Sequence, residues 1–232
     1  MSPFRISATA LKNFYTCPQR YLYYTELEPL QPKPKWLQDG IDAHALMAGE
    51  TVPKASPEAT RHYARLTDLV EIAELRILAR EVRQEIKLTR YVNLVRIIDA
   101  LGYDKYGQPV LMDYKTVNKM WYGRAFETET FQTQVYLLPP EKPKPLSAWP
   151  TTMLYLVSSG DGKQQIFPSR KDKDDRENVI HAVGVIRDAA KRGWFPKNRG
   201  YNCRYCDFCD ACYKAPGWEK LYKERKHGQE GE

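Results

Sequence analysis

Two aspartates and a lysine near the middle of the chain have the types and spacing of a site that binds a divalent cation. The segment DKYGQ has the composition of a turn, and strand-like runs at 91–101 and 109–115 flank it. In a hairpin symmetric about Tyr106, Asp99 and Asp113 face each other, with Cβ atoms about 4.5–5.5 Å apart. Lys115 is two residues beyond Asp113, so it points to the same face of the sheet.

The other residues of this hairpin are mostly apolar, which predicts a sheet that is buried on both faces. Two carboxylates at low dielectric repel each other, and Mg²⁺ or Mn²⁺ would compensate their charge. Lys115 would then orient a water molecule and offset phosphate charge in a transition state. The simpler interpretation is a structural ion pair between Asp113 and Lys115, because D-x-K is a common tripeptide.

The five cysteines lie only near the two ends of the chain. Cys17 is alone, whereas four others recur at every third position: Cys203, Cys206, Cys209 and Cys212. Such spacing leaves three possibilities open. The four C-terminal thiolates bind Zn²⁺, three of them bind an iron–sulfur cluster as in a ferredoxin-type run, or Cys17 completes the set from the other end.

Composition indicates a soluble globular protein whose positive charge suits a polyanionic partner, although many basic proteins bind none. Of its 232 residues, 42% are hydrophobic and 28% charged, and the net charge is +7. No apolar run approaches the roughly 20 residues of a membrane helix, and the N-terminal residues lack the apolar core of a signal peptide. We therefore expect a cytoplasmic protein, whose reduced thiols favour metal over disulfides. The positive charge is compatible with nucleic acid as a partner.

These residues need helices and strands to position them, and the hydrophobic periodicity predicts both. Helices are expected at 10–15, 20–27, 37–48, 57–80, 123–138 and 174–192, with a break at Cys17-Pro18. Strands are expected at 82–88, 91–101, 109–115, 151–157 and 164–168. The order of these elements indicates an α/β fold. We expect one domain at 1–218, with a helical part at 1–81, a catalytic core at 82–192 and a cysteine segment at 193–218, followed by a charged tail at 219–232.

Several motifs, in one order along the chain, resemble the PD-(D/E)xK nucleases, and within them the RecB-like branch. The opening ISATALKNFYTCPQRYLYY is similar to the S-x-S-x-L…CP…Y pattern of that branch, and GIDAH to its G-x-x-x-H motif. LVRIIDAL and MDYKT match the two strands that carry its acids and lysine. The helix motif Q-x-x-x-Y corresponds to Gln132 and Tyr136. The iron–sulfur CRISPR-associated exonucleases and the AddB nuclease domain are the members that the chain resembles over nearly its whole length.

The resemblance implies a restriction-endonuclease-like mixed sheet flanked by helices, and a role for each matching residue. Asp99, Asp113, His44 and the Tyr114 carbonyl would bind Mg²⁺ or Mn²⁺, and Lys115 would act on the attacking water. Gln132 and Tyr136 would hold DNA or support the site. A [4Fe–4S] cluster would be bound by Cys17, Cys203, Cys206 and Cys212, which leaves Cys209 as the spare cysteine.

Two residues need separate expectations. Arg96 stands where the family often has glycine, so the strand geometry there is open to change, and its guanidinium is a candidate phosphate contact. Glu85, on the preceding strand, is a candidate for an additional carboxylate, although a solvated strand residue is the simpler interpretation.

The function implied is a metal-dependent DNA exonuclease acting on single-stranded or frayed ends. Lys119, Arg124 and the PPEKPKP segment would attract the strand. Its setting would be CRISPR spacer acquisition, recombination and repair, or phage genome metabolism, with a CRISPR integrase or recombination proteins as partners. The alternatives are a non-catalytic DNA-end-binding adaptor with the same fold, and a zinc protein with an incidental hairpin.

Overall fold

The computed structural model describes residues 4–28, 35–121, 130–140, 145–146, 148–170 and 172–224. The chain divides into two compact units. Unit 1 comprises residues 1–8 and 34–180, and unit 2 comprises residues 9–33 and 181–232. Unit 2 is thus assembled from both ends of the chain. Among the described helices, none is long and apolar enough to cross a membrane.

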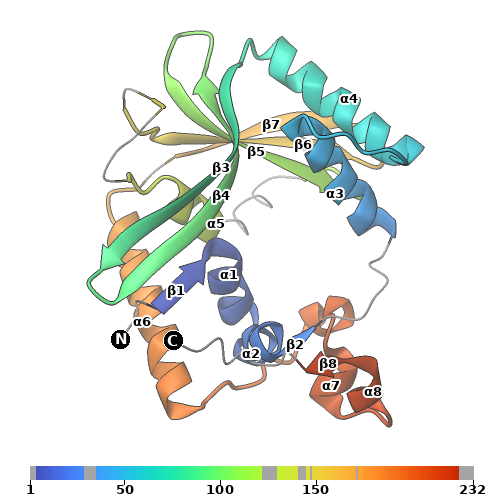
Figure 1. Ribbon diagram of the computed structural model, residues 1–232, viewed down its shortest axis with the longest axis vertical. Helices are drawn as coiled ribbons and strands as arrows, with labels where there is room; N and C mark the ends of the chain where they lie inside the picture. Colours follow the sequence, from blue (N-terminus) through green and yellow to red (C-terminus); the bar gives the residue numbers. More distant parts are fainter. Residues whose placement is uncertain are drawn as a thin grey trace. The chain divides into compact units, whose positions relative to one another are not determined.

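Unit 1 is built on a six-stranded mixed sheet (Figure 1). Its strands are β1 (Phe4–Ser7), β3 (Arg76–Thr89), β4 (Val92–Tyr103), β5 (Pro109–Val117), β6 (Thr152–Ser159) and β7 (Gln164–Arg170). The long β4 pairs with β3 along one edge. Along its other edge it pairs with β1, in parallel, over its first residues and with β5, antiparallel, over its last. Strands β5 and β6 are parallel, and β6 and β7 form an antiparallel pair.

Helices lie on both faces of this sheet. One face packs on α3 (Lys35–Ala48) and α4 (Pro57–Ile72), and the shared core includes Met47, Leu66, Met112 and Leu156. The opposite face carries α5 (Thr130–Tyr136). From α5, the Thr133 hydroxyl is 2.8 Å from that of Tyr155 on β6. Side chains alternate between the faces of a strand, so α5 lies on the face that presents Asp113 and Lys115.

Unit 2 is mainly helical. It contains most of α1 (Ala8–Thr16), α2 (Pro18–Glu26), η2 (Tyr201–Tyr205), α7 (Cys209–Tyr213), α8 (Trp218–Leu221) and a two-residue pairing of β2 (Leu27–Glu28) with β8 (Lys223–Glu224). The long α6 (Asp175–Arg192) begins in unit 1 and continues in unit 2. Phe208, Leu27 and Tyr222 form a small core. Cys17 is extended between α1 and α2, as the Cys17-Pro18 break predicts.

The predicted mixed α/β class is confirmed, two local predictions are wrong, and one strand was not predicted. The helix expected at 57–80 ends at Ile72, because Glu74 turns the chain at φ 51° and β3 starts at Arg76. Strand β1 was not anticipated, since four residues carry little periodicity. The sheet is not buried on both faces throughout, because Ile97 is 44% exposed. The helix expected at 123–138 is seen from Thr130 onward, and residues 122–129 lie outside the described residues.

Candidate active site

The β4–β5 hairpin has the register that symmetry about Tyr106 predicts. Ala100 pairs with Met112, and Tyr103 pairs with Pro109. At the turn, the Asp104 carboxylate accepts hydrogen bonds from the Tyr106 and Gln108 amides, and Gly107 adopts φ 74°, which favours glycine. The paired region ends at Ala100 and Met112. Asp99 and Asp113 are the next residues outward, where the two strands separate.

The Asp99 carboxylate lies in this gap between the strands. Its Oδ2 accepts a hydrogen bond of 2.7 Å from the Tyr114 amide, which replaces a backbone pairing. The same oxygen is 3.5 Å from His44 Nδ1. Burial, and then the charge of Asp113, raise the pKa of Asp99 well above its ordinary value. Without a cation, the protein therefore disfavours the ionised form of this side chain.

The Asp113 carboxylate is held by two side chains. It is almost fully buried, and its Oδ2 is 2.6 Å from Lys115 Nζ. Its Oδ1 accepts a hydrogen bond from Gln132 Nε2 on α5. The carbonyl oxygen of the same Gln132 amide accepts a hydrogen bond of 2.9 Å from Lys115 Nζ. Gln132 therefore bridges the acid and the base of the D-x-K sequence.

His44 approaches the carboxylates from α3. Burial, and then the positive charge of Lys115, lower its pKa to about 4, so its imidazole is neutral at neutral pH. A neutral imidazole can donate a lone pair to a metal ion. Gly40, one turn earlier, allows α3 to come close to β5: a Cβ on Gly40 would be 2.5 Å from the Thr116 hydroxyl. In the G-x-x-x-H spacing, the glycine thus allows the close helix–strand contact, and this contact places His44.

The two tyrosines of the expected site are both buried. The ring of Tyr114 packs in the core beneath α3 and α4, with its centroid 6.1 Å from that of His44. Burial raises the pKa of Tyr136, and the charges of Asp113 and Asp99 raise it further. Both side chains are therefore neutral at neutral pH. Of the groups that these two tyrosines offer, the backbone carbonyl of Tyr114 is the candidate metal ligand, as the resemblance implies.

The phosphate contact expected of Arg96 is wrong, whereas the simpler interpretation of Glu85, a solvated strand residue, is confirmed. Arg96 is only 2% exposed and donates to three main-chain carbonyls at the end of α5, so it does not offer its guanidinium to a phosphate. Glu85 forms an exposed ion pair of 2.7 Å with Arg5 and accepts a hydrogen bond from Asn93, so it supplies no carboxylate to Asp99. Of the expected DNA-attracting residues, Lys119 is described, whereas Arg124 and residues 141–144 lie outside the described residues.

The site contains the donor types that a hard divalent cation takes, namely two carboxylates, a backbone carbonyl and a neutral imidazole. Within the described parts of the chain, however, no three His, Cys, Asp or Glu side chains are arranged around a common point that would hold an ion. Lys115 and Gln132 engage the two oxygens of Asp113. Cation binding would require one of these contacts to lengthen.

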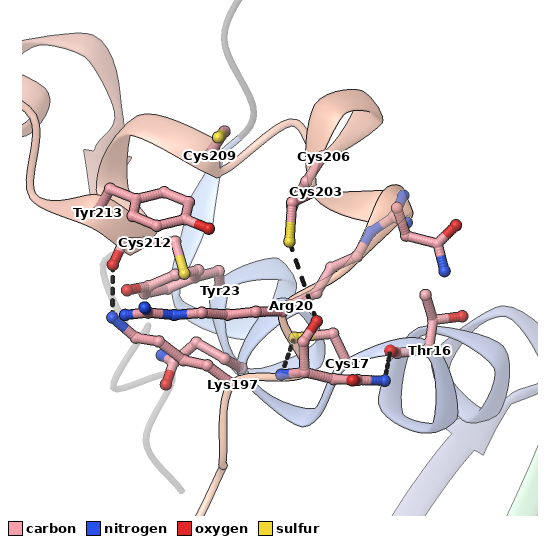
Figure 2. Close-up of a pocket in the computed structure, with 14 residues that line it drawn as sticks. Thr16, Cys17, Arg20, Tyr23, Lys197, Cys203, Cys206, Cys209, Cys212 and Tyr213 are labelled. Atoms are coloured by element: carbon pink, nitrogen blue, oxygen red, sulfur yellow. Dashed lines mark hydrogen bonds between the residues drawn. The ribbon is translucent and has the colours of Figure 1, made fainter.

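All five cysteines line one cavity in unit 2, with a volume of about 30 Å³. They are unpaired by disulfides and partly exposed. In Figure 2 the sulfurs of Cys17, Cys203 and Cys212 point toward one another, whereas that of Cys209 points away. Backbone N–H groups approach two of the sulfurs at 3.4 Å, from Asn198 to Cys17 and from Gly200 to Cys203. Three cations also line the cavity: Arg20, Lys197 and Arg199.

Comparison with solved structures supports the fold. A protein from Eubacterium rectale, named as an exonuclease, matches with a TM-score of 0.55 and 13% identity, covering 91% of this chain and 88% of that one. A structure named SSO0001 matches with a TM-score of 0.49 and 14% identity over 90% and 85% of the two chains. LHK-Exo in complex with dAMP matches with a TM-score of 0.38 and 11% identity over 81% and 88%. A comparison with curated proteins gives no significant match.

A family profile provides the identification. The profile of the PD-(D/E)XK nuclease superfamily matches residues 59–213, which is more than half of the chain. The matched region contains Asp99, Asp113, Lys115 and Gln132, together with the four C-terminal cysteines, and begins after His44 and Cys17. The sheet, its flanking helices and the D-x-K strand agree with that match. This chain belongs to the PD-(D/E)XK nuclease superfamily.

Proposed function

We propose that this nuclease is a metal-dependent DNA exonuclease that hydrolyses phosphodiester bonds at single-stranded or frayed ends. One observation carries the proposal: Lys115 Nζ is 2.6 Å from a buried Asp113 carboxylate, beside Asp99 and a neutral His44. Three of these groups are potential oxygen or nitrogen ligands of a metal ion, and the fourth is a cation. A purely structural ion pair would not need a second buried carboxylate next to it.

The residues divide the chemistry among them. Asp99, Asp113, His44 and the Tyr114 carbonyl would hold Mg²⁺ or Mn²⁺, which when bound acidifies water and polarises a phosphoryl oxygen. Lys115 then orients the attacking water and stabilises negative charge that develops on the phosphate. Gln132 keeps Lys115 and Asp113 in place through its two hydrogen bonds. Tyr136 is one helical turn from Gln132, so its neutral side chain lies on the same face of α5 and supports the site.

The preference for DNA ends is the finer part of the proposal. The net charge of +7 favours a polyanion, and electrostatic attraction of this kind is independent of sequence. The exonuclease named above has the same fold, which makes action on ends the natural first test. Supply of processed ends to a CRISPR integrase or to recombination proteins stays a prediction.

The test uses 5′- and 3′-labelled single strands, incubated with Mg²⁺ or Mn²⁺. We expect progressive shortening by the parent protein and loss of at least about 10³-fold in Asp113→Ala and Lys115→Ala, because each change removes a ligand or the charge-stabilising group. The chain offers a matched control in Asp161-Gly162-Lys163, a second D-x-K ion pair of 3.5 Å that lies in the β6–β7 turn. Asp161→Ala and Lys163→Ala should keep full activity.

Undiminished cleavage by Asp113→Ala and Lys115→Ala would overturn the assignment of the site. Binding of DNA ends without any cleavage, with both metals supplied, would instead identify the protein as the non-catalytic adaptor.

We also propose that Cys17, Cys203, Cys206 and Cys212 bind a [4Fe–4S] cluster with a structural role. Four thiolates on a cluster lie farther apart than four thiolates on one ion, so the lack of a single-ion arrangement among the described residues does not oppose it. All four proposed ligands line the same cavity. N–H groups near the sulfurs of Cys17 and Cys203 would stabilise thiolate charge.

A further inference from the structure

Arg96 is a buried cation whose observed partners are neutral groups. Its Nη1 donates to the carbonyls of Val135, Tyr136 and Leu138 at 2.8, 2.6 and 2.7 Å. Its Nε and Nη2 donate to the side-chain oxygen of Gln84 on β3, at 3.0 and 2.6 Å. The guanidinium also lies over the ring of Trp149, 4.4 Å from its centroid. Three separate segments of unit 1 therefore meet at this one side chain.

Such a residue is costly to bury, which is why its partners matter. Taking a charge out of water requires compensating hydrogen bonds, and burial lowers the pKa of Arg96 to about 9. The end of a helix can compensate, because its last carbonyls lack intrahelical partners and carry partial negative charge. All three carbonyls that Arg96 binds lie at or just after the C-terminal end of α5. Arg96 thus caps this helix from the neighbouring strand.

Helix α5 depends on contacts of this kind. Seven of its residues are described, and most of the stability of a helix within a protein comes from its tertiary contacts. Trp149 reinforces the cap, since its Nε1 donates to the Tyr136 carbonyl at 3.1 Å. On the same helix, one turn before Tyr136, Gln132 bridges Asp113 and Lys115. A shift of the capped end would therefore move the Gln132 amide relative to the carboxylate.

We propose that Arg96 is a positioning residue for the active site: by capping α5 it sets the place of Gln132, which in turn holds Asp113 and Lys115. The expected loss of kcat rests on the proposed function, whereas the expected shift of the Gln132 amide does not. Lysine cannot replace Arg96, because a single ammonium group lacks the planar fork that reaches three carbonyls and Gln84 together.

The experiment compares Arg96→Lys, Gln132→Ala and the double variant, after thermal unfolding has shown that each is folded. We expect Arg96→Lys to lower kcat on end-labelled single strands by about 10- to 100-fold with little change in KM, since small misplacements of catalytic groups have effects of this size. In the Gln132→Ala background, Arg96→Lys should lower kcat by less than about twofold, because its effect passes through Gln132. Arg76→Met is the control: Arg76 stacks on Tyr103 in the same sheet, and its loss should leave kcat unchanged.

A second readout does not require cleavage. The side-chain amide resonance of Gln132, identified by its loss in Gln132→Ala, should shift in Arg96→Lys and stay in place in Arg76→Met. An unshifted resonance, or an equal kcat loss in both backgrounds, would overturn the proposal. If Arg96→Lys does not fold, Gln84→Leu replaces it, because that change frees two of the Arg96 hydrogen bonds and should produce a smaller shift of the same resonance. An inactive parent with a shifted resonance would refute the proposed function and leave the role of Arg96 supported.

Discussion

At the scale of single residues, the site is a set of charges that the protein only partly neutralises. Lys115 and Gln132 hold Asp113, whereas Asp99 has one backbone N–H group and a neutral His44. Asp99 also lies in the field of Asp113, and its pKa is raised in consequence. A carboxylate in this position is unfavourable for folding and favourable for cation binding, as expected for a residue selected for function.

Asp99→Asn should therefore raise the thermal stability of the metal-free protein at pH 7. A raised pKa in the folded state means that the ionised carboxylate destabilises the fold above its ordinary pKa of about 3.9, and that the penalty disappears below it. We expect a higher Tm for the variant, by about 2–4 °C for each kcal/mol. The difference should vanish near pH 3. Calorimetry across pH measures it, and an equal or lower Tm at pH 7 would contradict the expectation.

Sequence reasoning reached some of these residues and not others. Strand alternation and turn symmetry suffice to bring Asp99, Asp113 and Lys115 together, because both follow from local geometry. The bridge made by Gln132 depends on where α5 docks, which no local pattern specifies. The role of Arg96 could not be predicted for the same reason, since the carbonyls that it binds are 39 to 42 positions away in the chain. A charged residue in an otherwise apolar strand was the available signal.

At the scale of elements, α3 brings His44 to the Asp99 carboxylate, and α5 brings Gln132 to the Asp113 carboxylate. The close contact of Gly40 with β5 places His44 of helix α3. The cap that Arg96 forms on helix α5 places Gln132, which contacts Lys115. The boundary between α4 and β3 was predicted wrongly because the apolar spacing of a helix continues past the end of α4. Leu75 and Leu78 continue the helical spacing, but Leu78 lies 44% exposed on β3, and a left-handed Glu74 ends the helix.

Gly40→Ala should lower kcat by about tenfold, because its Cβ would be 2.5 Å from the Thr116 hydroxyl and would push α3, with His44, away from β5. Thr116→Ala removes that oxygen and should restore activity when combined with Gly40→Ala. The control is Gly184→Ala in α6, where nothing lies within 4 Å of the added Cβ and helix propensity predicts a small gain in stability. Failure of Thr116→Ala to rescue kcat would refute the steric explanation.

At the scale of the whole molecule, the chain returns on itself. Unit 2 contains residues from both ends, and the two parts share contacts around the cysteines: the Asn198 amide donates to the Thr16 carbonyl at 2.9 Å, and the rings of Tyr24 and Phe208 are 4.8 Å apart. The predicted cluster would add bonds between the same two parts. Cysteine spacing suggested such a closure, but it could not show that aromatic packing accompanies it.

Removal of single cysteines tests the cluster. After anaerobic purification, the parent should be brown, absorb near about 400 nm and contain about four irons per chain. Cys17→Ala should lose the colour and the iron, whereas Cys209→Ala should retain both. An intact cluster in Cys17→Ala, lost in Cys209→Ala, would reverse the ligand assignment. Zinc in place of iron would refute the cluster.

The two-ended construction of unit 2 also sets an order of events during synthesis. Translation proceeds from the N-terminus, and domains generally fold as units as they emerge. Residues 34–180 can form their sheet while residues 181–224 are still being translated, but residues 9–33 must wait for later partners: Asn198, which contacts Cys17, lies 181 positions further along the chain. Until then Cys17 and the aromatic side chains of α1 and α2 lack those partners. Assembly of the thiol-bearing unit therefore follows formation of the sheet, and the proposed cluster would be bound only at that later stage.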